Sequence, residues 1–297
     1  MRIRERKLAN GNRSLYLDIY SKGVRKVEEY LRSTGRLNIA MLEVDLDFCR
    51  GFINFLRTAK NRRLKSEERT ISNCTGLQTQ AVFTAALNTA LRDGIIERNP
   101  MTLLTSKERF HQQESTRVYL TIDELKRMMA TPCDDGELKK AFLFACFTGL
   151  RLSDIRTFTW NKVLTTPNDS TRYIRVRMLK TQQVVNVPLS KDALGYLRET
   201  EDGDEPIFRL SSAASVIEQR LAEWAKNAGI EKHVTFHVSR HSYATMMLTI
   251  GVDIYTVSKL LGHKNVATTQ IYAKIIDQKK IDAVNMMDRF FDKDRQA

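Results

Sequence analysis

The spacing of apolar residues changes near residue 40, and this change divides the sequence. Residues 3–8, 15–20 and 24–30 alternate between apolar and polar positions, as half-buried strands do. They are separated by Asn-Gly-Asn at 10–12 and Ser-Lys-Gly at 21–23, which favour hairpin turns. Residues 1–36 are therefore expected to form a small basic sheet, although the third run could instead be a short helix.

From residue 42 onward the spacing becomes helical. Apolar side chains recur every three or four positions, at Leu42, Leu46, Cys49, Ile53 and Leu56. Residues 77–91 carry another apolar face, Gly94 is typical of a helix end, and Asn99 followed by proline closes the unit. The pattern predicts a helical bundle over residues 37–105. The polar stretch 103–117 is the best linker candidate, and we place the linker at 106–117.

The second domain is expected to span residues 118–297. It opens with a capping box, in which Thr121 lies three residues before Glu124, and a buried helix follows at 137–148. Two strand-like runs, 173–179 and 184–189, flank a turn at 181–183. Further helical patterns lie at 191–198, 211–228, 237–250, 254–261 and 276–291. The fold class is therefore mainly α with small β-sheets: a basic sheet, a helical domain, and a mixed but mostly helical second domain.

Composition narrows the function classes. Hydrophobic residues make up 42% of the chain, with 13 Gly and 5 Pro, which is typical of a folded globular protein. No apolar run reaches the roughly 18 residues of a membrane span. The first residues are charged, with no apolar segment of a secretory signal behind them. The four cysteines lack metal-ligand spacing, so we expect them to be small core side chains that bind no zinc and form no disulfides. Without a membrane span or a secretory signal, the protein is expected to be cytoplasmic.

Net charge gives the first indication of a partner. Lys and Arg total 48 against 35 Asp and Glu, and the first 120 residues hold 22 basic and 13 acidic side chains. Such an excess favours a polyanion, with nucleic acid ahead of a membrane surface. A merely basic soluble protein explains the charge alone equally well.

Three short segments contain residues suited to phosphate chemistry. His237 and Arg240 lie three apart at the start of a predicted helix, where an arginine and an imidazole can bind an anion. Arg151 directly follows a buried helix and the sequence Gly-Leu, and Tyr272 lies nine residues after His263. Taken alone, the first pair would usually cap a helix and the tyrosine would usually be a core residue.

In this order the three segments resemble the tyrosine recombinase (phage integrase) family. The resemblance covers about residues 117–285, through TGLRLSD (148–154), FHVSRHSYAT (236–245) and LLGHKNVATTQIYAKI (260–275). The family's six active positions correspond to Arg151, Lys180, His237, Arg240, His263 and Tyr272. The assignment of Lys180 depends on a single basic residue at the predicted hairpin. Lys180 could also be an ordinary solvent-exposed residue of that turn.

The resemblance implies a role for each of these residues. Arg151 and Arg240 would neutralise the non-bridging phosphate oxygens, because guanidinium donors match phosphate geometry. Tyr272 would attack phosphorus with help from His237, and Lys180 would protonate the departing 5′ oxygen. His263 would donate a hydrogen bond to the phosphate or support it.

The resemblance also implies that no cofactor takes part in the reaction. The sequence contains no P-loop, GxGxxG or acidic metal cluster, which agrees with a reaction that uses neither nucleotide nor metal. Two further positions are expected to support the site. Asp154 can reach back to an arginine or hold its helix, and His241 is expected to point away from the face of His237 and Arg240.

The expected partner is double-stranded DNA carrying a specific recombination site. The resemblance implies a homo-oligomer on DNA, commonly a tetrameric synapse, sometimes with accessory DNA-bending proteins. Because the partner is DNA, a location at the nucleoid is expected. Residues 37–105 would close a clamp on the duplex. Residues 1–36 look like an abbreviated arm-binding sheet of integrases from mobile elements, especially Bacteroidetes ones. The predicted helix 276–291 would be exchanged between protomers or would pack within its own chain.

Two alternatives to a site-specific recombinase remain open. One is a topoisomerase that forms the same 3′ linkage without exchanging strands between partners. The other is a DNA-binding regulator that no longer cleaves.

Overall fold

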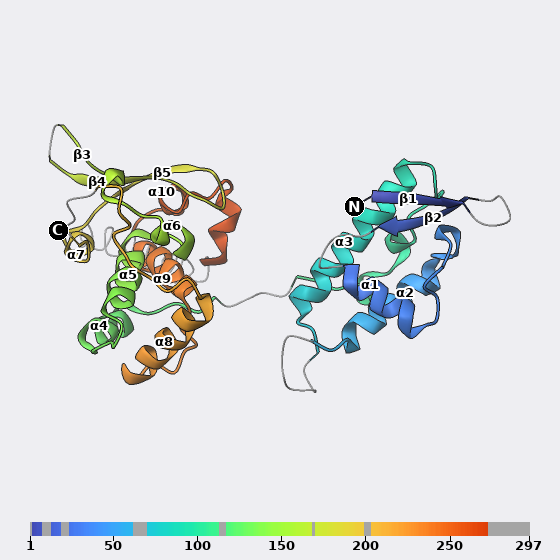
Figure 1. Ribbon diagram of the computed structural model, residues 1–297, viewed down its shortest axis with the longest axis horizontal. Coiled ribbons are helices and arrows are strands. Elements are labelled where there is room, and N and C mark those ends of the chain that lie inside the picture. Colours follow the sequence, from blue (N-terminus) through green and yellow to red (C-terminus); the bar gives the residue numbers. More distant parts are fainter. Residues whose placement is uncertain are drawn as a thin grey trace, which may run out of the picture. The chain divides into compact units, whose positions relative to one another are not determined.

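The computed structural model describes residues 2–7, 13–18, 24–61, 70–112, 117–167, 170–198 and 203–272. The chain divides into two compact units, Met1–Glu114 and Ser115–Ala297 (Figure 1). The described residues are mostly helical with small antiparallel sheets, so the expected fold class is confirmed. The expected turn at 10–12 and the expected helix at 276–291 lie outside the described residues.

The first unit is a helical domain with one strand pair. Its elements are β1 (Arg2–Lys7), β2 (Arg13–Asp18), α1 (Val24–Ser33), α2 (Leu46–Thr58), α3 (Asn73–Arg92), and the short 3₁₀ turns η1 (Met41–Glu43), η2 (Pro100–Leu103) and η3 (Ser106–Glu108). β1 and β2 pair antiparallel, with Arg2 opposite Asp18. The third run expected as a strand is the helix α1, the alternative that the sequence left open.

The burial of α1 explains why it is a helix. Val27, Tyr30 and Leu31 all join the core of the first unit, whereas a strand would point Tyr30 to the opposite side from its neighbours. The Tyr30 ring contacts Phe48 and Phe52 of α2, at centroid distances of 5.2 and 5.6 Å. Aromatic side chains of α1 and α2 thus pack together in the core of the first unit.

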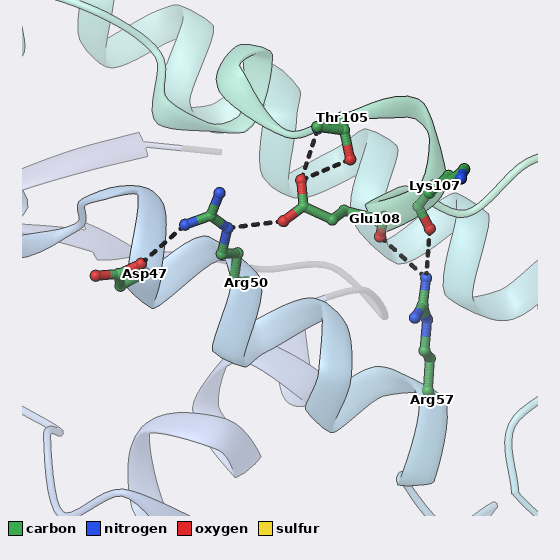
Figure 2. A network of polar contacts seen from close by, with 6 residues as sticks. All are labelled: Asp47, Arg50, Arg57, Thr105, Lys107 and Glu108. Carbon is green, nitrogen blue, oxygen red and sulfur yellow. Dashed lines mark hydrogen bonds and ion pairs between the residues drawn. The ribbon is translucent and has the colours of Figure 1, made fainter.

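The start of the expected linker is packed onto the first unit (Figure 2). Glu108 closes a capping box with Thr105 and accepts a 2.7 Å hydrogen bond from Nε of Arg50 on α2. Arg57, two turns further along α2, donates to the carbonyls of Lys107 and Glu108, each at 3.1 Å. Asn73 of α3 also donates to the carbonyl of His111 at 2.8 Å, so α2 and α3 together hold the chain as far as residue 111.

The second unit is also mainly helical. Its elements are α4 (Ile122–Ala130), α5 (Gly136–Thr148), α6 (Leu152–Arg156), η4 (Trp160–Lys162), β3 (Val163–Thr165), β4 (Arg172–Arg177), β5 (Val184–Pro188), α7 (Lys191–Gly195), α8 (Ala214–Asn227), α9 (Phe236–Thr249), α10 (Ile254–Leu260), η5 (Val266–Thr268) and η6 (Gln270–Tyr272). The sheet has the order β3-β4-β5 and lies beside α10 (Figure 1). The sequence did not predict β3 or α6, because three and five residues are too short to show a period.

Helix α5 is the centre of the second core. Most of its side chains are buried, and they cover all faces of the helix. The ring of Phe142 packs edge to face against Trp224 of α8 and Phe236 of α9, with centroid distances of 5.8 Å in both pairs. The helix ends at Gly149, whose φ of +71° is left-handed and favours glycine. This turn starts the segment that carries Arg151.

The cysteines differ from the expectation in part. Cys49 and Cys146 are buried in the two cores and Cys133 is partly buried, but Cys74, at the start of α3, is exposed. Position 74 belongs to the first turn of that helix, which faces solvent. Among the described residues no helix is long and apolar enough to cross a membrane, and no group of His, Cys, Asp or Glu could hold a metal ion.

Candidate active site

Arg240 is a buried cation at the centre of the second unit. Only 2% of its surface is exposed. Its Nη1 donates to the carbonyl of Gly149 at 2.6 Å, and its Nη2 donates to the carbonyl of Leu261 at 2.5 Å. Burial, followed by repulsion from Arg151, lowers the pKa of Arg240 to about 9. In the part of the chain that the structure describes, no carboxylate forms an ion pair with this guanidinium, so its charge is available to an anion.

Arg151 adds a second charge to the same place. It is the residue before α6 and is half-buried, and its Nη1 is buried without a hydrogen-bond partner among the described residues. Burial lowers its pKa, while Asp154 and Tyr272 act in the opposite direction. Two neighbouring guanidiniums repel each other, and this repulsion is relieved when a phosphate lies between them.

Tyr272 lies in contact with this positive region. It ends η6, is 4% exposed, and packs with Tyr243, Val257 and Leu261 in a small apolar cluster. Burial raises the pKa of Tyr272 to about 12, although Arg240, Arg117 and Arg151 each lower it. The hydroxyl is therefore protonated at neutral pH.

His241, not His237, holds the tyrosine hydroxyl. The Nδ1 of His241 lies 2.5 Å from the Oη of Tyr272, and both side chains are buried. The expectation that His241 points away from His237 is wrong. The two positions are four apart on α9 and share a face, so their rings meet edge to face at 4.5 Å. This i, i+4 spacing is the sequence signal that could have revealed the contact.

His237 occupies a more exposed place in the same field. Its pKa is lowered to about 4, mainly by partial burial and then by the charges of Arg240, Arg151 and Lys180. The described residues contain no hydrogen bond between His237 and Tyr272. The structure thus brings His237 near the arginines and Lys180 without direct contact to the tyrosine hydroxyl.

His263 is oriented by a threonine. Its Nδ1 lies 2.8 Å from Oγ1 of Thr269, which is fully buried and whose carbonyl also accepts the backbone N–H of Tyr272. Burial, with Arg240 and Arg151 nearby, lowers the pKa of His263 to about 4, so the ring is neutral at physiological pH. Thr269 therefore connects two predicted site residues.

Lys180 stands exposed in the turn between β4 and β5, and Asp154 fixes this turn. The turn is closed by a 2.8 Å hydrogen bond from the N–H of Met178 to the carbonyl of Gln183. The carboxylate of Asp154 accepts the N–H of Leu179 at 2.9 Å. Asp154 is 1% exposed, and its other oxygen has no hydrogen-bond partner among the described residues. Asp154 thus links α6 to the hairpin beside Lys180, and its charge also acts on Arg151, which is one of the two alternatives that the sequence offered.

Two basic residues near the site were missed by the sequence analysis. Arg117 lies close enough to lower the pKa of His241 and of Tyr272, and Lys162 is half-buried and feels the charge of Asp154. Neither stands in a recognisable motif, so nothing in the local sequence distinguishes them from other surface cations. The site therefore combines several cations with a buried tyrosine, an arrangement suited to attack on a phosphodiester.

Comparison with solved structures supports this class of fold. The chain resembles the XerH site-specific recombinase bound to a palindromic difH substrate, with a TM-score of 0.67 and 15% identity, covering 91% of this chain and 79% of that one. It also resembles the Tn1549 transposon integrase in complex with a circular intermediate DNA, with a TM-score of 0.62 and 18% identity, covering 86% and 90%. At these identities the likeness establishes the fold.

Sequence comparison establishes the family. Residues 118–279 match the phage integrase family, and residues 2–110 match the phage integrase SAM-like domain. A tyrosine recombinase of Thermosipho africanus (strain TCF52B) is 32% identical over 204 residues, which cover 65% of this chain and 69% of that protein. The chain belongs to the phage integrase family. It is a tyrosine recombinase, an enzyme of the class that cleaves and rejoins DNA.

Proposed function

We propose that Tyr272 is the nucleophile of this recombinase and forms a covalent 3′-phosphotyrosyl bond with DNA. The observation that carries the proposal is the position of its hydroxyl, buried in the field of Arg240 and Arg151. Neither guanidinium has an ion-pair partner among the described residues. A scissile phosphate supplies the missing negative charge.

The reaction then follows from ordinary phosphoryl transfer. Arg151 and Arg240 bind the non-bridging oxygens, whose charge grows in the transition state. The Oη of Tyr272 bonds to phosphorus, the phenol gives its proton to a neighbouring imidazole, and the bond from phosphorus to the 5′ oxygen breaks. Lys180 protonates that oxygen, and His263 donates a hydrogen bond to the phosphate. A 5′ hydroxyl from another strand reverses these steps, so the bond energy is retained and no nucleotide is consumed.

The rearrangement itself is a finer proposal. The Tn1549 protein named above is a transposon integrase, and this supports integration or excision of a mobile element as the task. The first unit, through its helical region, would clamp the duplex, and the strand pair β1–β2 would be an abbreviated arm-binding sheet of the kind found in Bacteroidetes elements. The working form would be a homo-oligomer on DNA, reaching a tetramer in the synapse, with 276–291 exchanged between protomers.

Covalent capture on a randomised duplex tests the nucleophile. The full chain is incubated with duplexes whose core sequence is randomised, denatured in detergent, and separated from free DNA. Sequencing of the attached strands gives the preferred site, from which a nicked substrate is made. Wild type should form a covalent band and Tyr272→Phe should not. An equal band from both proteins would refute the assignment of Tyr272.

The same substrate tests Arg240 and separates the alternatives. Arg240→Ala should slow covalent capture by about 10²–10³-fold or more, while DNA binding weakens only modestly. Near-normal cleavage by this variant would refute its role. Capture on any sequence, with relaxation of plasmids and no exchange between two duplexes, would instead identify a topoisomerase. Binding without any capture by wild type would identify a regulator.

A further inference from the structure

The hydrogen bond between Tyr272 and His241 lies at the centre of the site. It joins the reacting oxygen of the proposed nucleophile to Nδ1 of an imidazole at 2.5 Å. The tyrosine is 4% exposed and the histidine 7%, so solvent has little access to either side chain. The bond connects α9 to η6, two elements that are 31 positions apart at these residues.

The direction of the bond follows from the protonation states. Burial lowers the pKa of His241 to about 3, and the charges of His237, Arg117, Arg240 and His263 act in the same direction. The ring is therefore neutral, with one nitrogen that accepts a hydrogen bond. Because the phenol is protonated, the O–H of Tyr272 donates to Nδ1 and the other ring nitrogen carries the hydrogen.

This direction orients the nucleophile. When the O–H group points toward His241, the lone pairs of Oη point away from the imidazole. They are then free to attack the phosphorus of a bound phosphodiester. His237 does not make this contact: its ring packs edge to face with the ring of His241, and the described residues contain no hydrogen bond from it to Tyr272.

We propose that His241 is a catalytic residue that orients the Tyr272 hydroxyl and accepts its proton during DNA cleavage. The inference rests on the proposed function of Tyr272. In the step, the Oη–H bond breaks as the Oη–P bond forms, and the proton moves to Nδ1 of His241. The bond from phosphorus to the 5′ oxygen breaks, and the proton for that oxygen comes from Lys180. In the rejoining step His241 returns its proton to the phenolate.

The bound phosphate makes this transfer feasible. Its negative charge offsets that of Arg240, which adds to the effect of burial in keeping His241 neutral in the free protein. Oη also becomes far more acidic as it bonds to phosphorus, so the proton leaves during the attack and no free phenolate forms beforehand.

The test uses full-length variants and two forms of the selected duplex. One form has an ordinary scissile phosphodiester, and the other has sulfur in place of the bridging 5′ oxygen. A thiolate departs without a proton, so this second substrate removes the need for Lys180. The measured quantity is the single-turnover rate of covalent complex formation, with DNA affinity measured in parallel.

His241→Leu should slow covalent capture by about 100-fold on both substrates, because the lost contact is on the nucleophile side. Lys180→Ala should be slow only on the ordinary substrate. Thr245→Val is the matched control on α9, since Thr245 is buried one turn further along and its Oγ1 has no partner among the described residues. It should cleave like wild type.

Two amide variants keep the test decisive if His241→Leu does not fold. The amide oxygen of His241→Asn lies close to the place of Nδ1, whereas His241→Gln extends the amide by one carbon. The Asn variant should retain an acceptor that orients the Tyr272 hydroxyl, and it should cleave DNA at least about 10-fold faster than the Gln variant. This ratio corresponds to the free energy of one well-aligned hydrogen bond.

Three results would overturn the inference. The first is a rate of covalent complex formation for His241→Leu within about 3-fold of wild type. The second is equal rates for His241→Asn and His241→Gln. The third is a wild-type rate for His241→Leu on the sulfur substrate. Absence of covalent complex with wild type would refute the proposed function of Tyr272 instead, so the two failures are distinguishable.

Discussion

Replacement of Gly149 by alanine should destabilise the second unit and misplace the arginines. Gly149 ends α5 with φ of +71°, and its carbonyl accepts the Nη1 of Arg240. A Cβ at this position would lie 2.6 Å from Cδ1 of Tyr243 and 2.8 Å from Cδ2 of Leu261. Both neighbours are buried, so neither can move into solvent.

The expected loss has two parts. The left-handed conformation costs a residue with a Cβ about 1–2 kcal/mol. The added methyl group in a filled core costs about 1–3 kcal/mol more. Gly149→Ala should therefore lower the free energy of unfolding of the second unit by about 2–5 kcal/mol.

Intrinsic tryptophan fluorescence reports this unit alone. The chain has two tryptophans, Trp160 and Trp224, and both belong to the second unit. Urea denaturation followed by fluorescence gives the free energy from the midpoint and slope. Gly229→Ala is the matched control, because Gly229 has a similar φ of +67° in the same unit. Its added Cβ would meet only an ordinary contact with Nη1 of Arg127 at 3.5 Å.

The difference between the two variants isolates the steric term. Gly229→Ala should lose only the conformational part, and Gly149→Ala should lose about 1–3 kcal/mol more and should also cleave more slowly. Equal losses in the two variants would show that the core around Tyr243 relaxes freely, and the packing argument would then be wrong.

Three further predictions concern the support of the site. Thr269→Val should slow covalent capture about 10-fold by freeing His263, and Thr269→Ser should restore the rate; if serine fails to restore it, the hydroxyl is not the cause. Asp154→Leu should lower the rate on an ordinary phosphodiester far more than on the sulfur substrate, because it releases the hairpin of Lys180; an equal reduction on both would refute that link. The free energy of unfolding of the second unit should fall as pH is lowered from 6.5 toward 3. In that window the histidine at position 241 binds a proton in the unfolded chain but not in the folded one. This difference lowers the free energy of unfolding by up to about 1.4 kcal/mol per pH unit. His237 and His263 contribute in the same way down to about pH 4, so His241→Asn should reduce the slope without abolishing it. An unchanged slope would show that His241 is not responsible.

Much of the fold followed from local pattern. The buried helix expected at 137–148 is α5 (Gly136–Thr148), and the capping box of Thr121 and Glu124 forms at the start of α4. Long periodic segments and caps depend on neighbours in sequence, so they can be predicted from it. α1 was ambiguous because ten residues with mixed spacing fit two periods until the core of the first unit selects one.

The sequence by itself determined which residue types stand in which order. Arg151, His237, Arg240, His263 and Tyr272 were named from their motifs, and their assignment to catalysis stays a prediction. The structure brings them into one positive region, where His237 and His263 both feel Arg240 and Arg151.

Only the tertiary structure decided which side chain touches which. The bond from Tyr272 to His241 spans 31 positions, and the bond from Leu179 to Asp154 spans 25. Both depend on how separate elements pack, which no local periodicity encodes. A motif can name a tyrosine and two histidines, but the packing of η6 against α9 determines which histidine receives the hydroxyl.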